Sequence, residues 1–449
     1  MRDGTIAAVA TPPGMGGIGI IRLSGPDAER ILRAVFHRSA SDTLPFDSHR
    51  MYYGHLTEDG ETIDECMAVL MRAPRSYTRE DVAELHLHGG GYVVSRGLEL
   101  CLKHGARLAE AGEFTRRAFL NGRIDLSRAE AVMELISARG EAEHRFAVRQ
   151  LEGGAATFIR QASDDLYALQ AGLAACIDYP EEISDEEGAG VLRPGIERLI
   201  GSLREAVDER SSRLLENGLR TALCGRPNVG KSSLLNALLG EERAIVTDIP
   251  GTTRDTLQGE ITLGGVRVVL TDTAGLRRTE DPIEKIGVAR SEKALREADV
   301  RMLVLDGSQP MTEEEAAWAG SLTPGDAVVV NKADLPRLLT EEALRKAAPD
   351  VPIVVVSAKN PASLEPLKRF LRQRTAVSDR MILSQPRHVE AVRRAVGHLE
   401  DALRTLDRMT PDVASVDLQA AQAALAEITG DQADDKLLDA VFSQFCVGK

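Results

Sequence analysis

The stretch GRPNVGKS at residues 225–232 decides the fold of the central part of this 449-residue chain. Gly225 and Gly230 allow the backbone to turn its N–H groups inward around phosphates. The apolar residues 219–224 have the pattern of a buried strand and lead directly into this loop, and residues 232–239 have the pattern of a helix. A glycine loop between a strand and a helix predicts a nucleotide-binding P-loop.

The side chains around this loop are those that phosphates and Mg²⁺ require. Lys231 is expected to reach the β and γ phosphates, and the Ser232 hydroxyl is expected to bind Mg²⁺. Asp272, at the end of a predicted strand, is the expected carboxylate on the Mg²⁺ side of the site. Gly275 can give its backbone N–H to the γ phosphate.

Three further motifs follow in the order typical of guanine-nucleotide sites: DTAG at 272–275, NKAD at 331–334 and SAK at 357–359. The Asp334 carboxylate can accept hydrogen bonds from the ring N–H and the exocyclic amine of guanine. Adenine cannot satisfy this acceptor, and a buried acceptor left unpaired costs about 1–3 kcal/mol. The sequence therefore predicts a site for GTP.

The usual residue that orients the attacking water is missing. Leu276 follows DTAG, where many GTPases carry glutamine. Glu284 could orient a water through its carboxylate, and the Asn228 amide oxygen could help to hold a monovalent cation near the β–γ bridge. From the residues alone, a solvent-facing helix position for Glu284 and a loop-stabilising role for Asn228 stay open.

Composition limits the class of protein. The net charge of −14 and the pI near 5.3 exclude a global basic field that would draw the chain onto nucleic acid. No apolar run approaches the ~20 residues of a membrane span. The five cysteines include no CxxC pair, and no signal or transit pattern is present. We expect a cytosolic protein that does not act at a membrane.

The hydrophobic periodicity predicts several domains of α/β and α class. The alternation of strand and helix patterns predicts a Ras-like α/β domain with a mostly parallel sheet. Helical patterns lie on both sides of it, beginning with a capping box at Ser127–Glu130 and including an apolar stripe over residues 389–406. The GTPase domain is therefore predicted to be inserted in an all-helical domain that follows a mixed α+β N-terminal domain. The expected boundaries are 1–120 for the N-terminal domain, 121–217 and 377–449 for the two helical parts, and 218–376 for the GTPase domain.

Several segments outside the GTPase motifs resemble the tRNA-modification GTPase family called MnmE or TrmE. The most specific is the C-terminal FCVGK at 445–449, and TDIPGTTRD at 247–255 fits as well. The N-terminal third carries the others, which are the opening residues 5–25, SYTRED at 76–81, HLHGG at 86–90 and GEFTRRAFLN at 112–121.

The resemblance implies a function in tRNA modification. Members of the family help to install a C5 substituent, of the carboxymethylaminomethyl or aminomethyl type, on the wobble uridine of certain tRNAs. They work as homodimers with a flavin-containing partner, MnmG (also called GidA), in a heterotetramer. Their N-terminal domain binds a formyl-tetrahydrofolate-type one-carbon carrier, and their GTPase domains pair across the dimer when GTP and K⁺ are bound.

The resemblance also assigns roles to residues of this chain. Glu284 would orient the hydrolytic water, and Lys231 and Cys446 complete the predicted catalytic residues. The residues that would surround K⁺ are Asn228, Thr247, Ile249 and Thr252. The residues that would bind Mg²⁺ are Ser232 and Thr253. The folate site would be lined by Arg22, Glu80, Arg123 and Lys449. The full predicted GTP site comprises Asn228, Val229, Gly230, Lys231, Ser232, Ser233, Thr247, Asp248, Ile249, Pro250, Gly251, Thr252, Thr253, Asp272, Thr273, Ala274, Gly275, Asn331, Lys332, Asp334, Ser357, Ala358 and Lys359.

Some features allow more than one interpretation. Cys446 does not fit a prenylation signal, because the chain ends in Gly448 and Lys449; it is either an incidental thiol or a functional one near the folate site. His86 and His88 are predicted to lie on one face of a strand, where such histidines pack or line a pocket more often than they bind a metal.

A regulatory Era- or Der-like GTPase switch in ribosome assembly is an alternative function. It would share the P-loop, but it leaves the N-terminal residues and the CVGK tail unexplained. A folate enzyme with a vestigial GTP domain is disfavoured by the complete set of nucleotide motifs.

Overall fold

The computed structural model describes residues 4–38, 45–179, 181, 185–241, 258–273, 293–378, 380–407 and 411–448. The chain forms two compact units, which are described separately here. The first unit comprises Met1–Met133, Gln150–Glu182 and Met409–Lys449, and the second comprises Glu134–Arg149 and Ile183–Arg408.

A seven-stranded sheet forms the centre of the first unit, in the order β3-β4-β5-β6-β2-β1-β7. All its neighbouring strands are antiparallel except β1 and β7, which are parallel. The bounds are β1 Ile6–Val9, β2 Ile18–Ser24, β3 Phe36–His37, β4 Met51–Glu58, β5 Glu61–Met71, β6 Val82–His88 and β7 Arg107–Leu108. The N-terminal sequence has strand patterns over residues 17–23, 51–56, 67–71 and 83–87, and each of them corresponds to a strand of this sheet, whereas β1, β3 and β7 are additions.

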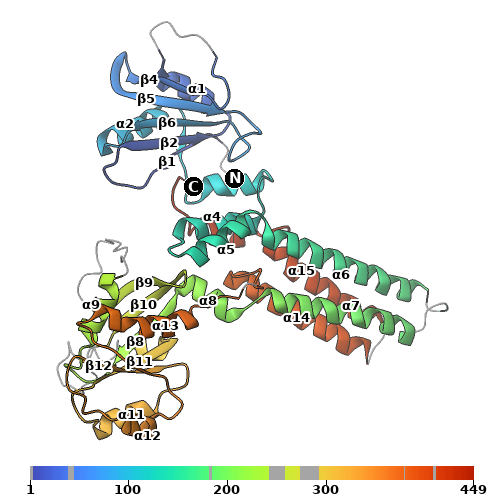
Figure 1. Ribbon diagram of the computed structural model, residues 1–449. Coiled ribbons are helices and arrows are strands. Elements are labelled where there is room, and N and C mark those ends of the chain that lie inside the picture. The colour runs from blue at the N-terminus through green and yellow to red at the C-terminus, as the bar shows by residue number, and fades with distance from the viewer. Residues whose placement is uncertain are drawn as a thin grey trace, which may run out of the picture. The chain divides into compact units, whose positions relative to one another are not determined.

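The core of this sheet lies under two helices, α1 (Ala28–Val35) and α2 (Gly91–Lys103). Figure 1 shows both helices beside the sheet. Ile21 and Leu85, on adjacent strands, are completely buried there. Gly97 allows α2 to come close, because a Cβ at this position would lie 2.7 Å from Cδ1 of Ile21.

The other helices of the first unit are α3 Glu113–Leu120, α4 Leu126–Ser137, α6 Gly154–Asp178, α15 Pro411–Thr429 and α16 Asp435–Phe442. The long helices α6 and α15 pack against each other. The predicted capping box at Ser127 is wrong, because α4 already begins at Leu126. The carboxylate of Asp125 accepts the backbone N–H of Arg128 instead, at 3.0 Å.

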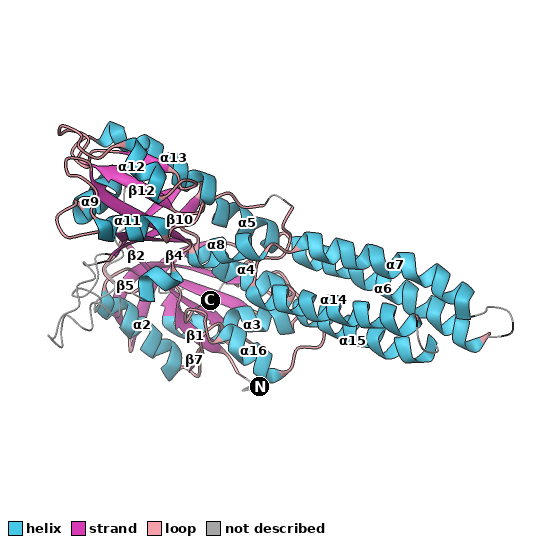
Figure 2. Ribbon diagram, turned by 90° about the horizontal axis from the view of Figure 1, so that it is seen from below, coloured by secondary structure: helices cyan, strands magenta, loops and turns pink. Residues whose placement is uncertain are grey.

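The second unit contains a six-stranded sheet in the order β13-β12-β11-β8-β10-β9. Only the edge strand β9 is antiparallel to its neighbour, and Figure 2 shows helices on both sides of these strands. The strands are β8 Leu219–Cys224, β9 Gln258–Leu263, β10 Val266–Asp272, β11 Val300–Asp306, β12 Ala327–Asn331 and β13 Ile353–Val355. This arrangement confirms the predicted doubly covered, mostly parallel sheet.

The helices of the second unit are α5 Glu141–Leu151, α7 Asp185–Ala206, α8 Glu209–Asn217, α9 Lys231–Glu241, α11 Glu313–Gly320, α12 Glu341–Ala347, η1 Pro361–Leu364, α13 Glu365–Arg374 and α14 Pro386–Leu406. Two of the boundaries between the units fall inside helices, one between Met133 and Glu134 in α4 and one between Arg149 and Gln150 in the last turn of α5. Helix α14 packs on α7. It does so through the predicted stripe, in which Val389, Val392, Val396 and Leu399 are all buried.

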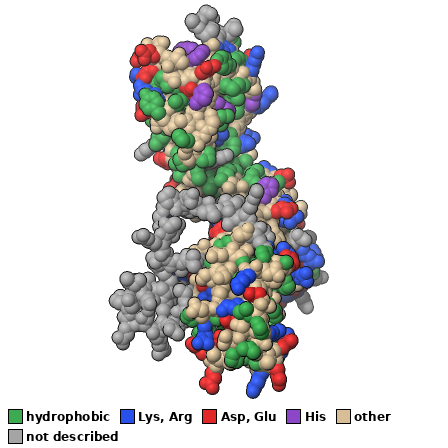
Figure 3. All heavy atoms as spheres, turned by 60° about the vertical axis from the view of Figure 1, so that its left-hand side comes forward, with side chains coloured by type: hydrophobic (Ala, Val, Ile, Leu, Met, Phe, Trp, Pro, Cys, Tyr) green, Lys and Arg blue, Asp and Glu red, His purple; other side chains and the backbone are tan. Residues whose placement is uncertain are grey.

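None of the helices in the described part of the chain combines the length and the apolar character needed to cross a bilayer. On the face drawn in Figure 3, the Lys and Arg side chains lie among Asp and Glu side chains.

Candidate nucleotide site and N-terminal site

The P-loop lies between β8 and α9, at the carboxyl edge of the sheet. The neighbours of β8, strands β10 and β11, lie on opposite sides of it, so the loop stands where the strand order changes direction and ligands of such sheets bind. Gly225 and Gly230 have φ angles of 139° and 95°. A Cβ at Gly225 would lie 2.3 Å from the carbonyl oxygen of Val304, and one at Gly230 would lie 2.4 Å from Nδ2 of Asn331. Glycine is therefore required at both positions, because the φ angles are positive and because a side chain would clash with neighbouring atoms.

Lys231 and Ser232, the first residues of α9, carry the chemistry of the loop. The Lys231 ammonium donates hydrogen bonds to the carbonyl oxygens of Gly225 and Arg226, at 2.9 and 3.1 Å. Burial lowers the pKa of Lys231, and the nearby Asp272 carboxylate only partly opposes that effect. The side chain is thus folded over the phosphate cradle in a conformation from which it can turn to a phosphate.

The Ser232 hydroxyl donates a hydrogen bond to Oδ2 of Asp272, at 2.6 Å. The other oxygen of that carboxylate, Oδ1, is buried and has no hydrogen-bond partner. A buried, unpartnered carboxylate oxygen next to a hydroxyl fits the oxygen-ligand chemistry of Mg²⁺. Thr273 fixes the end of β10, because both its N–H and its hydroxyl donate to the Leu223 carbonyl oxygen.

The NKAD and SAK residues meet at the ends of β12 and β13. Asn331 is 1% exposed, and it joins two loops: its Nδ2 donates to the Val229 carbonyl oxygen at 3.0 Å, and its Oδ1 accepts from the Ala358 N–H at 3.1 Å. Asp334 accepts a hydrogen bond from the Ser357 hydroxyl at 2.7 Å and lies 3.3 Å from the Lys359 ammonium. These contacts, the Ser357 bond foremost, lower the pKa of Asp334 and keep its carboxylate ionised, so that it can act as a hydrogen-bond acceptor.

Asp306 is a residue of this site that the motifs do not reveal. It ends β11, and its carboxylate accepts a hydrogen bond from the Lys332 ammonium at 2.6 Å. Lys332 has a φ of 62°, so the ion pair holds a backbone conformation that a non-glycine residue rarely adopts. The only sequence signal was the position of Asp306 at a strand end on the same sheet edge.

Part of the predicted site lies outside the described residues. These residues are Thr247, Asp248, Ile249, Pro250, Gly251, Thr252, Thr253, Ala274, Gly275 and Glu284 of the nucleotide site, and Lys449 of the folate site. The remaining predicted nucleotide residues are gathered at the carboxyl edge of the second unit's sheet.

In the first unit, two of the residues predicted for the folate site meet at one aromatic ring. The Arg22 guanidinium lies 5.9 Å and the Arg123 guanidinium 4.7 Å from the centre of the Tyr77 ring. Nε of Arg22 donates to Glu84 at 2.8 Å. Burial works to raise the pKa of Glu84, but the charge and hydrogen bond of Arg22 outweigh it, and the pKa is lowered.

The C-terminal tail lies against the same region. Val447 forms an isolated antiparallel bridge with Ala111, and Nη1 of Arg22 donates to the Gly448 carbonyl oxygen at 3.3 Å. Gly448 has a φ of 98°, and a Cβ there would lie 2.4 Å from the Val9 carbonyl oxygen. The Cys446 side chain is exposed. The tail thus brings residue 448 next to Arg22 by a fit that only glycine allows.

Glu80 is half-buried and belongs to a different hydrogen-bond network. Its carboxylate accepts hydrogen bonds from the Ser24 hydroxyl at 2.7 Å and from Arg117 at 2.8 Å. Arg117, which is 8% exposed, also donates to the carbonyl oxygen of Gly4 at 2.9 Å. Sequence reasoning missed Arg117, because its partners are distant in the chain.

His86 and His88 pair with separate acids. Nε2 of His86 lies 3.1 Å from Glu84, and Nδ1 of His88 lies 2.7 Å from Asp64. The Asp64 hydrogen bond raises the pKa of His88. Each histidine thus has an acidic partner of its own, and the interpretation of both as packing or pocket-lining residues remains a prediction.

Comparison with known proteins covers the whole chain. The family model described as GTP-binding protein TrmE N-terminus matches residues 5–123, and the model described as MnmE helical domain matches residues 126–446. The tRNA modification GTPase MnmE of Heliobacterium modesticaldum is 46% identical over 99% of both chains. Proteins of the same name from Symbiobacterium thermophilum and Listeria innocua are 45% and 44% identical, each over 100% of both chains.

Proposed function

This chain belongs to the MnmE family of tRNA-modification GTPases, and on that premise we propose that it hydrolyses GTP within the system that modifies the wobble uridine of certain tRNAs. The product would carry a C5 substituent of the carboxymethylaminomethyl or aminomethyl type. The observation that carries the proposal is the likeness to relatives of that name over the full length of both chains. A ribosome-assembly switch of the Era or Der kind accounts for the GTPase motifs alone.

The geometry of the P-loop supports GTP hydrolysis. Lys231 binds the β and γ phosphates, and the backbone N–H groups between Gly225 and Gly230 point at the same oxygens. Ser232 and Thr253 would hold Mg²⁺, which would neutralise charge on the phosphate oxygens. Asp334 reads guanine through its two carboxylate oxygens.

We place the water-orienting carboxylate at Glu284 and the K⁺ ligands at Asn228, Thr247, Ile249 and Thr252. Asn228 supports this assignment, because it is exposed in the P-loop with a φ of 66°. K⁺ prefers oxygen ligands, and a cation beside the β–γ bridge supplies the charge that an arginine finger supplies elsewhere.

A formyl-tetrahydrofolate-type carrier is the ligand that we assign to the N-terminal domain, with Arg22, Glu80, Arg123 and Lys449 as its binding residues. The Tyr77 ring, with two guanidinium groups 5.9 and 4.7 Å from its centre, supports an anionic ligand with flat rings. Cys446 is then close in sequence to the folate-binding Lys449 and serves as a candidate catalytic thiol.

We further propose that the protein is a cytoplasmic homodimer, which forms a heterotetramer with a flavin-containing MnmG-type partner. The two GTPase domains of the homodimer pair when K⁺ and GTP are bound. With a net charge of −14, this chain leaves most of the tRNA contact to a basic partner. Tight, steeply salt-dependent tRNA binding by the isolated protein would contradict that division. The proposed domain boundaries are 1–120, 121–217, 218–376 and 377–449.

The test is GTP turnover of the purified protein in KCl and in NaCl at equal ionic strength. We expect strong stimulation by K⁺, with GTP affinity retained and turnover strongly reduced in Glu284→Ala. Equal rates in the two salts would remove the proposed charge stabiliser, and unchanged turnover in the variant would remove Glu284 from its role. Loss of wobble-uridine modification in a strain that carries only Glu284→Ala tests the link to tRNA.

A further inference from the structure

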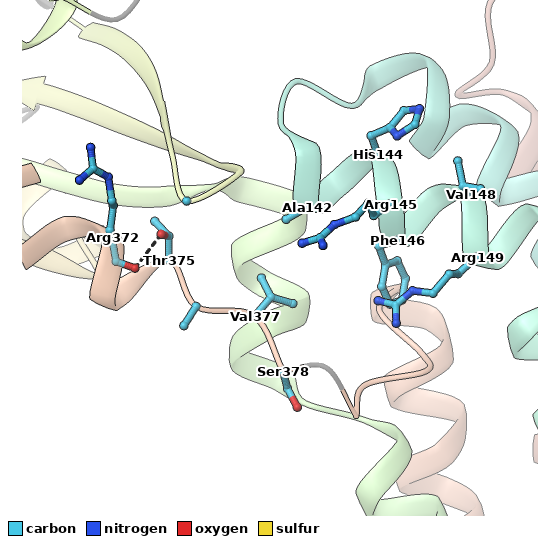
Figure 4. Close-up of a pocket in the computed structure, with 12 residues that line it drawn as sticks. Ala142, His144, Arg145, Phe146, Val148, Arg149, Arg372, Thr375, Val377 and Ser378 are labelled. Carbon is cyan, nitrogen blue, oxygen red and sulfur yellow. Dashed lines mark hydrogen bonds between the residues drawn. The ribbon is translucent and has the colours of Figure 1, made fainter. Parts of the chain in front are cut away.

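A cavity of about 430 Å³ lies within the second unit, away from the P-loop. Figure 4 shows its walls, which are helix α5, the turn between β9 and β10, and the segment that follows α13. The lining residues are Ala142, His144, Arg145, Phe146, Val148, Arg149, Gly264, Arg372, Thr375, Ala376, Val377 and Ser378. A volume of this size is within the range of small-molecule sites, about 300–1,000 Å³.

The walls of this cavity are fixed by close backbone contacts. The Ala142 N–H donates to the Gly265 carbonyl oxygen at 2.9 Å. A Cβ at Gly140 would lie 2.1 Å from the same oxygen, and one at Gly264 would lie 2.7 Å from Oγ1 of Thr375. On the opposite side, the Ser378 N–H donates to the Ser211 hydroxyl at 2.9 Å. The cavity is therefore formed before a ligand arrives, which reduces the entropy cost of binding.

The charge of the lining is unlike that of the whole protein. The chain has 69 acidic and 55 basic residues, yet the lining residues include three arginines and a histidine and no carboxylate. Arg372 is paired with Glu365 at 2.6 Å. Arg145 and Arg149 make no ion pair with an acidic side chain of the described residues. In Figure 4 the Arg145 side chain extends from α5 toward the segment that carries Val377.

An apolar surface lies next to these charges. Phe146 is 3% exposed, and the Arg149 guanidinium lies 5.4 Å from the centre of its ring. Val148 and Val377 add aliphatic surface. We propose that this cavity binds a small organic anion, with an apolar body against the half-buried Val148 and Val377 and a carboxylate or phosphate at the exposed Arg145 and Arg149. The planar guanidinium forks suit such oxyanions.

The test uses the fluorescent probe 8-anilinonaphthalene-1-sulfonate, whose sulfonate replaces the carboxylate or phosphate. It is titrated into the full chain saturated with Mg²⁺, GDP and 5-formyl-tetrahydrofolate, so that the nucleotide site and the N-terminal folate site proposed above are both blocked. We expect one saturable site, which binds about tenfold or more weakly in the double variant Arg145→Gln, Arg149→Gln because two charge-assisted contacts are lost. Val377→Trp fills the cavity and removes binding. Arg160→Gln, an exposed arginine on α6, is the matched control and leaves the affinity unchanged.

Equal probe affinity in the wild type, the double variant and Val377→Trp overturns the proposal, provided that all three still bind GDP. Displacement of the probe by equimolar tRNA also overturns it, because the anion held there is then an RNA phosphate. This binding measurement does not depend on GTP hydrolysis, so it remains informative if the proposed function fails.

Discussion

At the scale of the residue, Lys231 is 7% exposed and burial lowers the pKa of its ammonium group. The charged form therefore costs stability in the absence of nucleotide. Below the lowered folded-state pKa both states hold the proton and this cost is present in full. As pH rises toward the unfolded value of 10.5, the native state loses the proton first and becomes more stable.

We predict that Lys231→Met stabilises the nucleotide-free protein by about 1 kcal/mol at pH 7 and abolishes GTP binding. The gain should shrink as pH approaches 10. Urea unfolding at several pH values, with nucleotide binding measured in parallel, checks both effects. Lys346→Met, at an exposed position of α12, is the control. A variant less stable than the wild type at pH 7 would show that the lysine's hydrogen bonds outweigh its burial.

Asp334 offers a second test at this scale. Asp334→Asn replaces one acceptor oxygen by a donor, so that it loses two charge-assisted hydrogen bonds to guanine. We expect GTP affinity to fall about 100-fold or more, with xanthosine triphosphate partly recovering it, because xanthine carries an oxygen where guanine carries the amine. Equilibrium binding of both nucleotides checks this, and Asp350→Asn on the surface is the control. Undiminished GTP binding would exclude the base-reading role.

The residues of the P-loop, NKAD and SAK could be predicted because each motif is a local sequence whose backbone shape follows from its own glycines and strand ends. Asp306 and Arg117 could not, because the tertiary fold brings their partners Lys332 and Glu80 to them from distant parts of the chain. A long-range ion pair leaves no periodic pattern in the sequence.

At the scale of the element, the hairpin of β9 and β10 was predictable from its Gly264-Gly265 turn. Both glycines have positive φ, 60° and 78°, as a type I′ turn requires. The start of α4 was mispredicted, because Asp125 and Ser127 are both good caps and only the helix's own register decides between them. Strand β1 was missed, because four residues are too short for an alternating pattern.

The contact between Gly140 and the turn of the β9–β10 hairpin can be tested by adding a single methyl group at Gly140. Gly140 has an ordinary φ, so Gly140→Ala leaves the local backbone unstrained, but its Cβ would lie 2.1 Å from the Gly265 carbonyl oxygen. We predict destabilisation of about 1–3 kcal/mol from this overpacking, measured by thermal unfolding with GDP bound. Gly201→Ala in α7, where a Cβ meets nothing within 4 Å, should instead stabilise by about 1 kcal/mol. Equal effects in the two variants would contradict a specific contact.

At the scale of the whole molecule, the fold class followed from periodicity: alternating strands and helices in the middle, helical stripes on both sides, and short strands at the N-terminus. The sequence could not indicate which distant segments pair. The parallel pairing of β1 with β7 and the bridge between Val447 and Ala111 join residues about 100 or more positions apart. Such pairings require the closure of long loops, and a local sequence pattern contains no information about which distant segments meet.

The apolar core of the second unit's sheet is built almost entirely from residues between 214 and 377. A domain with its own core is expected to fold alone, so we predict that the proposed GTPase segment 218–376, expressed by itself, unfolds cooperatively and binds GDP. Calorimetry and nucleotide titration check this. A fragment that starts at residue 226 is the control, because it lacks β8, which pairs with both β10 and β11, and it should not fold. If segment 218–376 is itself unfolded, the helices outside it contribute to its core and the proposed boundaries are too narrow.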